Sequence, residues 1–197
     1  MIAESWKPLD KAFYQGEDVC GIARGLLGKV LWVAHDGGLK ALVITETEAY
    51  EGITDRASHA WGGRVTARTA TMYLRGGHAY VYLCYGIHWL FNVVTAGEGN
   101  PHAVLVRGGV PLTTMHDAEN AKDWKGKLVS GPGRVTTYLG IDKTHNGLWL
   151  PDAGGIGLAD VGIEIKTEAI VRTPRIGVDY AGEHAAWLYR FVCFLLV

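Results

Sequence analysis

The stretch LVITETEAY at residues 42–50 starts as an apolar, β-branched run and ends with two carboxylates and a tyrosine. Such β-branched residues favour a strand. Because side chains alternate along a strand, one face is predicted to carry Leu42, Ile44, Glu46, Glu48 and Tyr50. A face that begins apolar and ends polar indicates a strand that runs from the hydrophobic core into a cleft.

The two carboxylates of this stretch allow two interpretations. If Glu46 and Glu48 lie close together, their pKa values separate, and acid–base chemistry can use the difference. Alternatively, the strand simply ends in water and both glutamates are solvated. The spacing alone is compatible with either arrangement.

The segments around this strand predict further strands and a few helices. Apolar residues recur at helical spacing in residues 19–27, and Gly28 supplies the stop. The turn Asp36-Gly37-Gly38 predicts a hairpin between strands at 29–35 and 39–47. Later segments are predicted to be a short helix near 66–72, strands at 79–85, 88–95, 102–107, 162–166 and 169–172, and a helix opened by residues 130–134.

Length and composition predict a single folded domain. The chain has 197 residues, of which 48% are hydrophobic and 20% are charged. This is enough chain to bury a real core, and the composition excludes a disordered tail. Since no linker or repeat interrupts the pattern, residues 1–197 are predicted to form one mixed, largely antiparallel α+β domain.

The distribution of charge matters more than its total. A formal net charge of −1 argues against a nucleic-acid partner, since such domains tend to be basic. However, residues 60–107 contain four basic residues and one acidic residue, whereas residues 1–59 contain six and nine. The positive excess therefore lies in one of the most aromatic parts of the chain.

The sequence shows no sign of a membrane span or of secretion. The longest apolar run, residues 191–197, has seven residues and is too short to cross a bilayer. No charged-then-apolar leader opens the chain, so we expect a protein that is not secreted. The cysteines are expected to be reduced and mostly buried: Cys20, Cys84 and Cys193.

Aromatic residues and arginines interleave in the basic region. Tyr80, Tyr82, Tyr85, Trp89 and Phe91 lie between Arg64, Arg68, Arg75 and Arg107. This combination is typical of a surface that stacks on nucleic-acid bases and contacts phosphates. It is equally compatible with an ordinary sheet core whose tyrosine hydroxyls reach the surface. Tyr85 breaks the alternation directly before Gly86, which predicts an exposed turn.

Other possible sites are less specific. His59 lies in a polar loop, where a lone histidine is ordinarily a surface or hydrogen-bonded residue. Cys84 and His88 would form a metal site only with two further ligands, and none lies at suitable spacing, so no metal is predicted. The glycines at 154–157 lack the strand–turn–helix context of a dinucleotide site.

Several blocks of the chain together resemble the alkyladenine (3-methyladenine) DNA glycosylase family, the mammalian type with bacterial homologues. The most specific blocks are TETEAYEG at residues 45–52 and YVYLCYG at residues 80–86. The other blocks occur in the family's order: ARGLLGKVL at 23–31, ASHA at 57–60, GR at 63–64, NV at 92–93, AVLVR at 103–107, SGPGR at 130–134 and RIGV at 175–178.

The resemblance implies a monofunctional glycosylase that removes alkylated or deaminated purines from double-stranded DNA. The implied substrates are 3-methyladenine, 7-methylguanine, hypoxanthine and ethenoadenine. A glutamate-activated water would hydrolyse the N-glycosidic bond and leave an abasic site, with no lyase activity. Also implied are a curved, mainly antiparallel sheet with surrounding helices and a protruding β-hairpin, a monomer, no cofactor and no membrane partner. The implied location is the cytoplasm, in association with the nucleoid, in a bacterium, or the nucleus in a eukaryote.

The resemblance also assigns roles to residues. Glu48 matches the general base, and Tyr85 matches the residue that intercalates where the flipped nucleotide was. The base pocket would be formed by Tyr50, His59, Tyr82, Asn92 and Leu105, with Asn92 helping to exclude guanine. The DNA backbone would be contacted by Arg64, Thr66, Arg107, Lys143 and Arg175.

Physical chemistry agrees with these roles. A purine alkylated at N3 or N7 is cationic, so stacking between Tyr50 and Tyr82 is expected to gain roughly 0.5–2 kcal/mol of cation–π energy. Glu46 would raise the pKa of Glu48 unless a cation such as Arg107 compensates. We predict that Glu48 is ionised and that Glu46 makes a structural hydrogen bond.

Two other functions fit parts of the sequence. One is a module that binds damaged bases without cleaving them, which the joint presence of Glu48, Tyr50, His59 and Tyr85 disfavours. The other is a hydrolase of free nucleosides, for which Tyr85 and the basic flank would serve no purpose.

Overall fold

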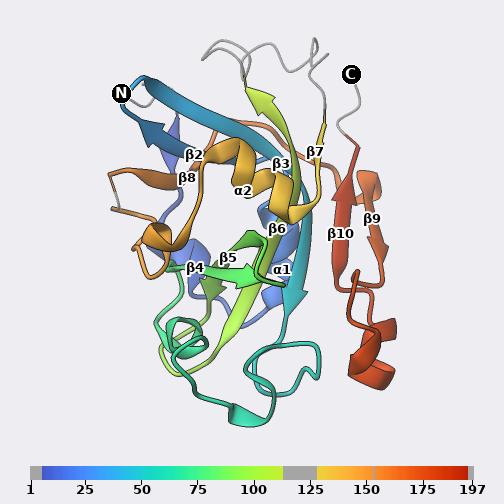
Figure 1. The fold of residues 1–197 in the computed structure, drawn as a ribbon. Coiled ribbons are helices and arrows are strands. Elements are labelled where there is room, and N and C mark those ends of the chain that lie inside the picture. Colours follow the sequence, from blue (N-terminus) through green and yellow to red (C-terminus); the bar gives the residue numbers. More distant parts are fainter. Residues whose placement is uncertain (1–5, 113–127, 153, 195–197) are drawn as a thin grey trace.

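The strands found in the described part of this protein form one antiparallel sheet. A computed structural model describes residues 6–112, 128–152 and 154–194 (Figure 1). The strands are β1 Lys7–Pro8, β2 Val30–His35, β3 Gly38–Tyr50, β4 Ala79–Cys84, β5 His88–Thr95, β6 His102–Leu112, β7 Val129–Ser130, β8 Ile156–Asp160, β9 Ile170–Thr173 and β10 Arg190–Cys193. Within the described residues these ten strands join in the order β1-β8-β2-β3-β6-β5-β4, with β10 beside β3, β9 beside β10 and β7 beside β6.

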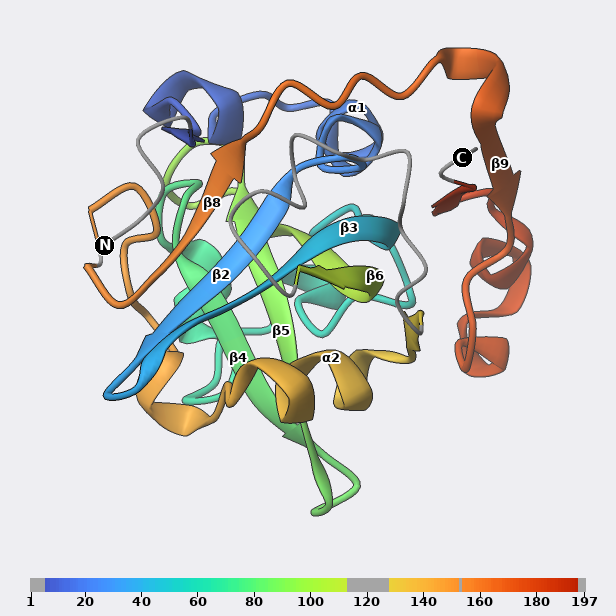
Figure 2. The same cartoon turned by 90° about the horizontal axis from the view of Figure 1, so that it is seen from above.

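The central strand is β3, which contains the stretch at residues 42–50. Its first half pairs with β2, its second half pairs with β10, and β6 runs along its other edge, all antiparallel. Figures 1 and 2 show this long strand sweeping across the molecule. The predicted α+β class with a mainly antiparallel sheet is confirmed.

Among the described residues, two α-helices pack against the sheet, and the sequence predicts where each begins. The first of them ends at Gly25 and not at the predicted stop Gly28. Helix α1, Val19–Gly25, begins at Asp18, whose side chain accepts a hydrogen bond from the Gly21 N–H at 2.7 Å. Helix α2, Pro132–Leu139, begins with proline and ends at Gly140, which has a φ of 72°. Short 3-10 turns are η1 Lys11–Tyr14, η2 Trp61–Gly63, η3 Ala70–Tyr73, η6 Lys143–His145, η7 Thr167–Ala169 and η8 Asp179–Ala186.

The main core joins both helices to the middle of the sheet. It contains the fully buried side chains of Ala23, Leu139, Leu42 and Phe91. Replacing one such leucine by alanine costs about 2–5 kcal/mol in typical cores. This packing makes the ends of β3, β5 and β6 a rigid support for the polar residues that they carry.

The hairpin of β4 and β5 projects from the body of the molecule (Figure 2). Its two strands pair from Ala79 opposite Val93 to Cys84 opposite His88, so that only the residues between Cys84 and His88 form the tip. This is the protruding hairpin that the resemblance implied.

Other predictions about the elements need correction. Residues 162–166 are not a strand. The strand is β8 just before them, where Gly157 leaves room for the Trp32 ring, which would lie 2.8 Å from a Cβ at that position. The helix expected near 66–72 is the 3-10 turn η3.

Residues 195–197 of the apolar C-terminal run lie outside the described residues. All three cysteines are free, with Cys193 buried and the other two half-buried. No helix in the described part of the chain is long and apolar enough to cross a membrane.

Candidate active site

An irregularity in the pairing of β3 with β6 shapes the site. Between Ile44 and Thr47 the register shifts twice, which leaves Thr45 on β3 and Arg107 on β6 without a partner residue. An extra residue in a strand reverses the alternation of its side chains. On each strand, the side chains beyond this point therefore lie on the side of the sheet opposite to the one that strict alternation predicts.

This reversal corrects the face predicted for β3. Leu42 and Ile44 lie in the main core, but so does Ala49, and the Thr47 hydroxyl donates to the Ala23 carbonyl of α1 at 2.8 Å. The polar residues at positions 46, 48 and 50 therefore face the opposite side from Leu42 and Ile44. Strict alternation failed because the bulge lies in the middle of the strand.

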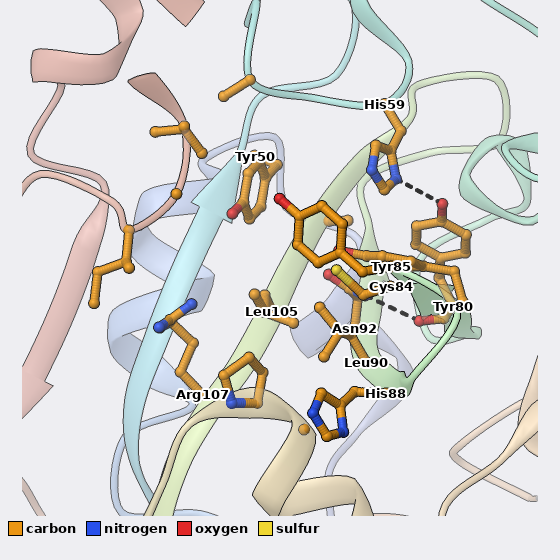
Figure 3. A pocket seen from close by; sticks show the side chains of 18 of the residues that line it. Tyr50, His59, Tyr80, Cys84, Tyr85, His88, Leu90, Asn92, Leu105 and Arg107 are labelled. Atoms are coloured by element: carbon orange, nitrogen blue, oxygen red, sulfur yellow. Dashed lines mark hydrogen bonds between the residues drawn. The ribbon is translucent and has the colours of Figure 1, made fainter. Parts of the chain in front are cut away.

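A cavity of about 530 Å³ opens on that opposite side. All five residues predicted for the base pocket line it: Tyr50, His59, Tyr82, Asn92 and Leu105. In Figure 3, Tyr50 and His59 lie at one end, Arg107 and His88 lie at the other, and Leu105 and Asn92 lie between them. The volume is within the range of about 300–1,000 Å³ typical of small-molecule sites.

Glu48 lies directly behind the cavity wall and is fully buried. Its Oε2 accepts hydrogen bonds from the Tyr50 hydroxyl at 2.9 Å and Arg107 Nη1 at 3.4 Å. Its Oε1 accepts one from the Ile176 backbone N–H at 2.8 Å. Burial raises the pKa of Glu48, and the Arg107 guanidinium is the strongest influence that lowers it. The three donors all stabilise the ionised carboxylate.

Glu46 makes structural contacts, as predicted. Its Oε1 accepts hydrogen bonds from Arg107 Nε at 3.0 Å and Arg190 Nε at 2.7 Å. Arg107 thus bridges the two carboxylates, with only 11% of its side chain exposed. This placement does not fit the role in DNA-backbone contact that the resemblance assigned to Arg107, because its guanidinium is directed at Glu46 and Glu48 within the protein.

The aromatic walls are held together by polar contacts. His59 Nδ1 and the Tyr80 hydroxyl are hydrogen-bonded at 2.8 Å, and the His59 ring is edge-on to Tyr82 with 4.6 Å between centroids. Asn92 Nδ2 donates to the Tyr80 carbonyl at 3.1 Å. Burial lowers the pKa of His59 to about 4, so the imidazole is neutral at physiological pH.

Tyr85 forms the tip of the protruding hairpin and is 92% exposed. It has a φ of 50° and Gly86 has a φ of 71°, and the Ile87 N–H closes the turn on the Cys84 carbonyl at 3.0 Å. A tyrosine in this left-handed region is strained. Ile87, which the sequence analysis did not single out, is also exposed beside it, so the tip presents two apolar side chains.

Arg175 lies in the interior of the protein. Its guanidinium contacts both carboxylate oxygens of Asp55, and both side chains are fully buried. It also donates to the carbonyls of Ala49 at 2.8 Å and His184 at 3.2 Å, and it stacks 4.8 Å from the centre of the Tyr50 ring. A DNA-backbone contact does not fit this placement. Arg175 instead ties the end of β3, the loop after it and the C-terminal segment together.

The remaining residues predicted to contact DNA are exposed. Arg64 and Thr66 line a second cavity of about 540 Å³, which shares His59, Arg68 and Tyr180 with the first cavity. Lys143 lies farther along the chain in η6.

Several residues that line the cavity were not assigned a role from the sequence. Tyr80 and Arg68 belong to the aromatic and arginine pattern, which therefore indicated them without assigning a role. Ile176 and Tyr180 also line the cavity: Ile176 belongs to the block at 175–178, to which only Arg175 was assigned a role, and no local pattern distinguishes Tyr180. Cys84 and His88 line it as well, but among the described residues no three His, Cys, Asp or Glu side chains are arranged to hold a metal ion.

Comparison with known proteins agrees with the geometry. Residues 12–194 match the profile of the family described as methylpurine-DNA glycosylase. A protein of Bdellovibrio bacteriovorus is 42% identical over 184 residues, covering 93% of each chain. One from Chlamydia felis is 39% identical over 190 residues, covering 93% of this chain and 95% of its own. Both are provisionally named 3-methyladenine DNA glycosylase. This chain belongs to the methylpurine-DNA glycosylase family.

Proposed function

We propose that this protein flips alkylated or deaminated purines out of double-stranded DNA and hydrolyses their N-glycosidic bonds. The observation that carries the proposal is a fully buried glutamate directly behind an aromatic cavity, beside a hairpin tip with an exposed tyrosine. The substrates would include 3-methyladenine, 7-methylguanine, hypoxanthine and ethenoadenine. The protein would act as a monomer in the cytoplasm without a cofactor.

Glu48 would serve as the general base. A water that replaces one of the donors on Oε2 would lose its proton to the carboxylate and attack C1′ as the sugar gains oxocarbenium character. The glycosidic electrons would leave with the purine, and an abasic site would remain. No lysine from the described residues lines the cavity, which supports hydrolysis without lyase chemistry.

Base flipping would be stabilised from two sides. Extruding a nucleotide costs a few kcal/mol, because stacking and pairing are lost. The Tyr85 side chain would fill the gap in the duplex, and Tyr50 and Tyr82 would stack on the extruded purine. Arg64, Thr66 and Lys143 are proposed to contact the phosphates.

Duplex oligonucleotides that each carry one modified purine would test this function. We expect release of the free base, with strand scission only after alkali. Scission without alkali would overturn the hydrolytic mechanism. Tight binding without release would identify a binding module, and release from free nucleosides but not from duplexes would identify a nucleoside hydrolase.

Replacing Tyr85 with Gly should lower the excision activity without lowering the stability of the protein. Glycine adopts the left-handed turn without strain, so the free energy of unfolding should stay equal or rise by up to about 1 kcal/mol. The rate of excision from a fully paired duplex should fall by a factor of about ten or more, because no side chain fills the gap left by the extruded nucleotide. Chemical denaturation and single-turnover base release measure the two effects.

A mispaired duplex provides the control for Tyr85→Gly. A purine opposite a mismatch is already partly unpaired, so the variant should lose less activity on it. An equal loss on paired and mispaired duplexes would contradict the intercalating role.

Replacing Arg107 with Gln should move the pH dependence of excision. Glu48 must be ionised to act, so activity rises as pH increases through its pKa. Because Arg107 lowers the pKa of Glu48, its loss should raise that pKa and move the acid limb to higher pH. Single-turnover rates across the pH range measure the shift, and an unchanged acid limb would show that Arg107 does not act on Glu48.

A further inference from the structure

Arg68 is a basic residue of the cavity wall to which the proposed reaction gives no role. Its guanidinium carbon lies 4.7 Å from the centre of the Tyr82 ring, and the side chain lines both the base cavity and the neighbouring one. Tyr82 is one of the two rings on which the purine is proposed to stack. A charge on Arg68 therefore acts close to the bound base.

The turn that carries Arg68 is held firmly, although the side chain itself is exposed. Thr69 is buried, and its Oγ1 accepts from the Thr66 N–H at 2.9 Å and donates to the Arg64 carbonyl at 3.0 Å. The Tyr73 hydroxyl donates to the same carbonyl at 3.2 Å. These bonds fix the backbone at a point from which the guanidinium reaches Tyr82.

Arg68 differs from Arg107, the other arginine of the cavity wall, and from Arg175, which stacks on Tyr50, because no carboxylate among the described residues neutralises it. Arg107 contacts Glu46 and Glu48, and Arg175 is paired with Asp55. In the part of the chain that the structure describes, no ion pair within 4.0 Å involves Arg68, and no carboxylate side chain lines the cavity. The wall that meets the purine therefore carries a net positive charge.

A positive wall distinguishes two classes of damaged purine. Purines alkylated at N3 or N7 are cationic, so Arg68 repels them and competes with them for the face of the Tyr82 ring. Neutral purines such as hypoxanthine and ethenoadenine offer nitrogen or oxygen acceptors to the guanidinium N–H groups. We propose that Arg68 determines substrate class in this pocket and favours neutral damaged purines over cationic ones.

This inference rests on the proposed function and deepens it. Two tyrosines alone would favour a cationic purine, as the sequence analysis expected. The guanidinium against Tyr82 opposes that preference, and it is visible only once the turn at residues 64–69 is placed beside β4.

The test compares two duplexes that differ only in the lesion, one with hypoxanthine and one with 7-methylguanine. In single-turnover assays, corrected for spontaneous base loss, Arg68→Gln should lower the rate ratio of hypoxanthine to 7-methylguanine about tenfold. Arg68→Lys keeps the charge and should retain most of the ratio. Added salt should narrow the difference between wild type and Arg68→Gln, because the exposed charge is screened.

Arg64→Gln is the matched control, since Arg64 lies on the same turn but does not line the base cavity. It should change both rates by the same factor. An equal change for both lesions in Arg68→Gln would overturn the proposal and make Arg68 a general DNA contact. Failure of the proposed function gives a different result, in which the wild-type protein releases neither base, and it would overturn both proposals.

Discussion

Replacing Glu48 with Gln is expected to slow base release by about 10²–10⁴-fold, the range that a positioned general base contributes. Glutamine nearly matches the shape of glutamate, but it cannot take a proton from water. Single-turnover release from a lesion-containing duplex measures the loss. Binding to the same duplex should be retained, because Glu48 lies behind the cavity wall and not on the exposed surface.

Thermal unfolding distinguishes a chemical defect from a folding defect in this variant. Burial raises the pKa of Glu48, so its ionised form costs folding free energy at pH values above that pKa. The glutamine side chain of the Glu48→Gln variant carries no charge, and the midpoint of unfolding at neutral pH should therefore equal or exceed that of the wild type.

Glu46→Gln is the matched control for Glu48→Gln. Both positions lie on β3, and both carboxylates contact Arg107. Because Glu46 also accepts from Arg190, its substitution should destabilise the fold by about 1–3 kcal/mol. Base release at a temperature where the variant is folded should change far less than in Glu48→Gln. Equal losses of activity in the two variants would show that Glu48 is not the base.

Replacing Asp55 with Ala is expected to lower the free energy of unfolding by about 3–5 kcal/mol, because it leaves the Arg175 charge buried without its partner. Both side chains are fully buried, and Asp55 also accepts the backbone N–H of Ala57 at 2.9 Å. For a domain of this length, the midpoint of thermal unfolding should fall by roughly 6–20 °C. Urea denaturation and calorimetry measure the two quantities.

A surface ion pair serves as the control for Asp55→Ala. Lys11 and Asp152 lie 3.5 Å apart with about two thirds of each side chain exposed, so Lys11→Met should cost less than about 1 kcal/mol. If Asp55→Ala is no more destabilising than Lys11→Met, the buried pair does not hold the loop and the C-terminal segment together.

The Asp55→Ala substitution should also disturb the walls of the cavity. Arg175 stacks on Tyr50, and the loop held by Asp55 carries His59. Excision measured well below the unfolding transition is therefore expected to fall as well, since both walls lose their support.

Much of the fold is local in origin, which is why sequence alone predicts it. Asp36-Gly37-Gly38 directs a hairpin, Pro132 opens α2, and Tyr85 before Gly86 marks a turn; all three lie where expected. Each of these signals acts within a few residues, through backbone conformation or a missing N–H.

The strand at 42–50 shows where local reasoning stops. Its existence and its polar end were predictable, but the opposite orientation of Leu42 and Glu48 was not, because the unpaired residue Thr45 reverses the alternation along β3. A bulge depends on how two strands pair. Thr45 and Arg107 are 62 positions apart, and nothing in either segment alone reveals that both will be left unpaired.

The candidate active site also combines features that are predictable from the sequence with features that depend on the fold. The amino-acid sequence establishes which residue types are available: a glutamate and a tyrosine two positions apart, a histidine in the next loop and aromatic residues on a hairpin. The role of each residue depends on the folded arrangement. The fold brings the Ile176 N–H to Glu48, buries Arg175 against Asp55, and places Arg68 against Tyr82 with no counter-charge from the described residues. The reason is physical: charge, burial and pKa depend on neighbours that are close in space but distant along the chain.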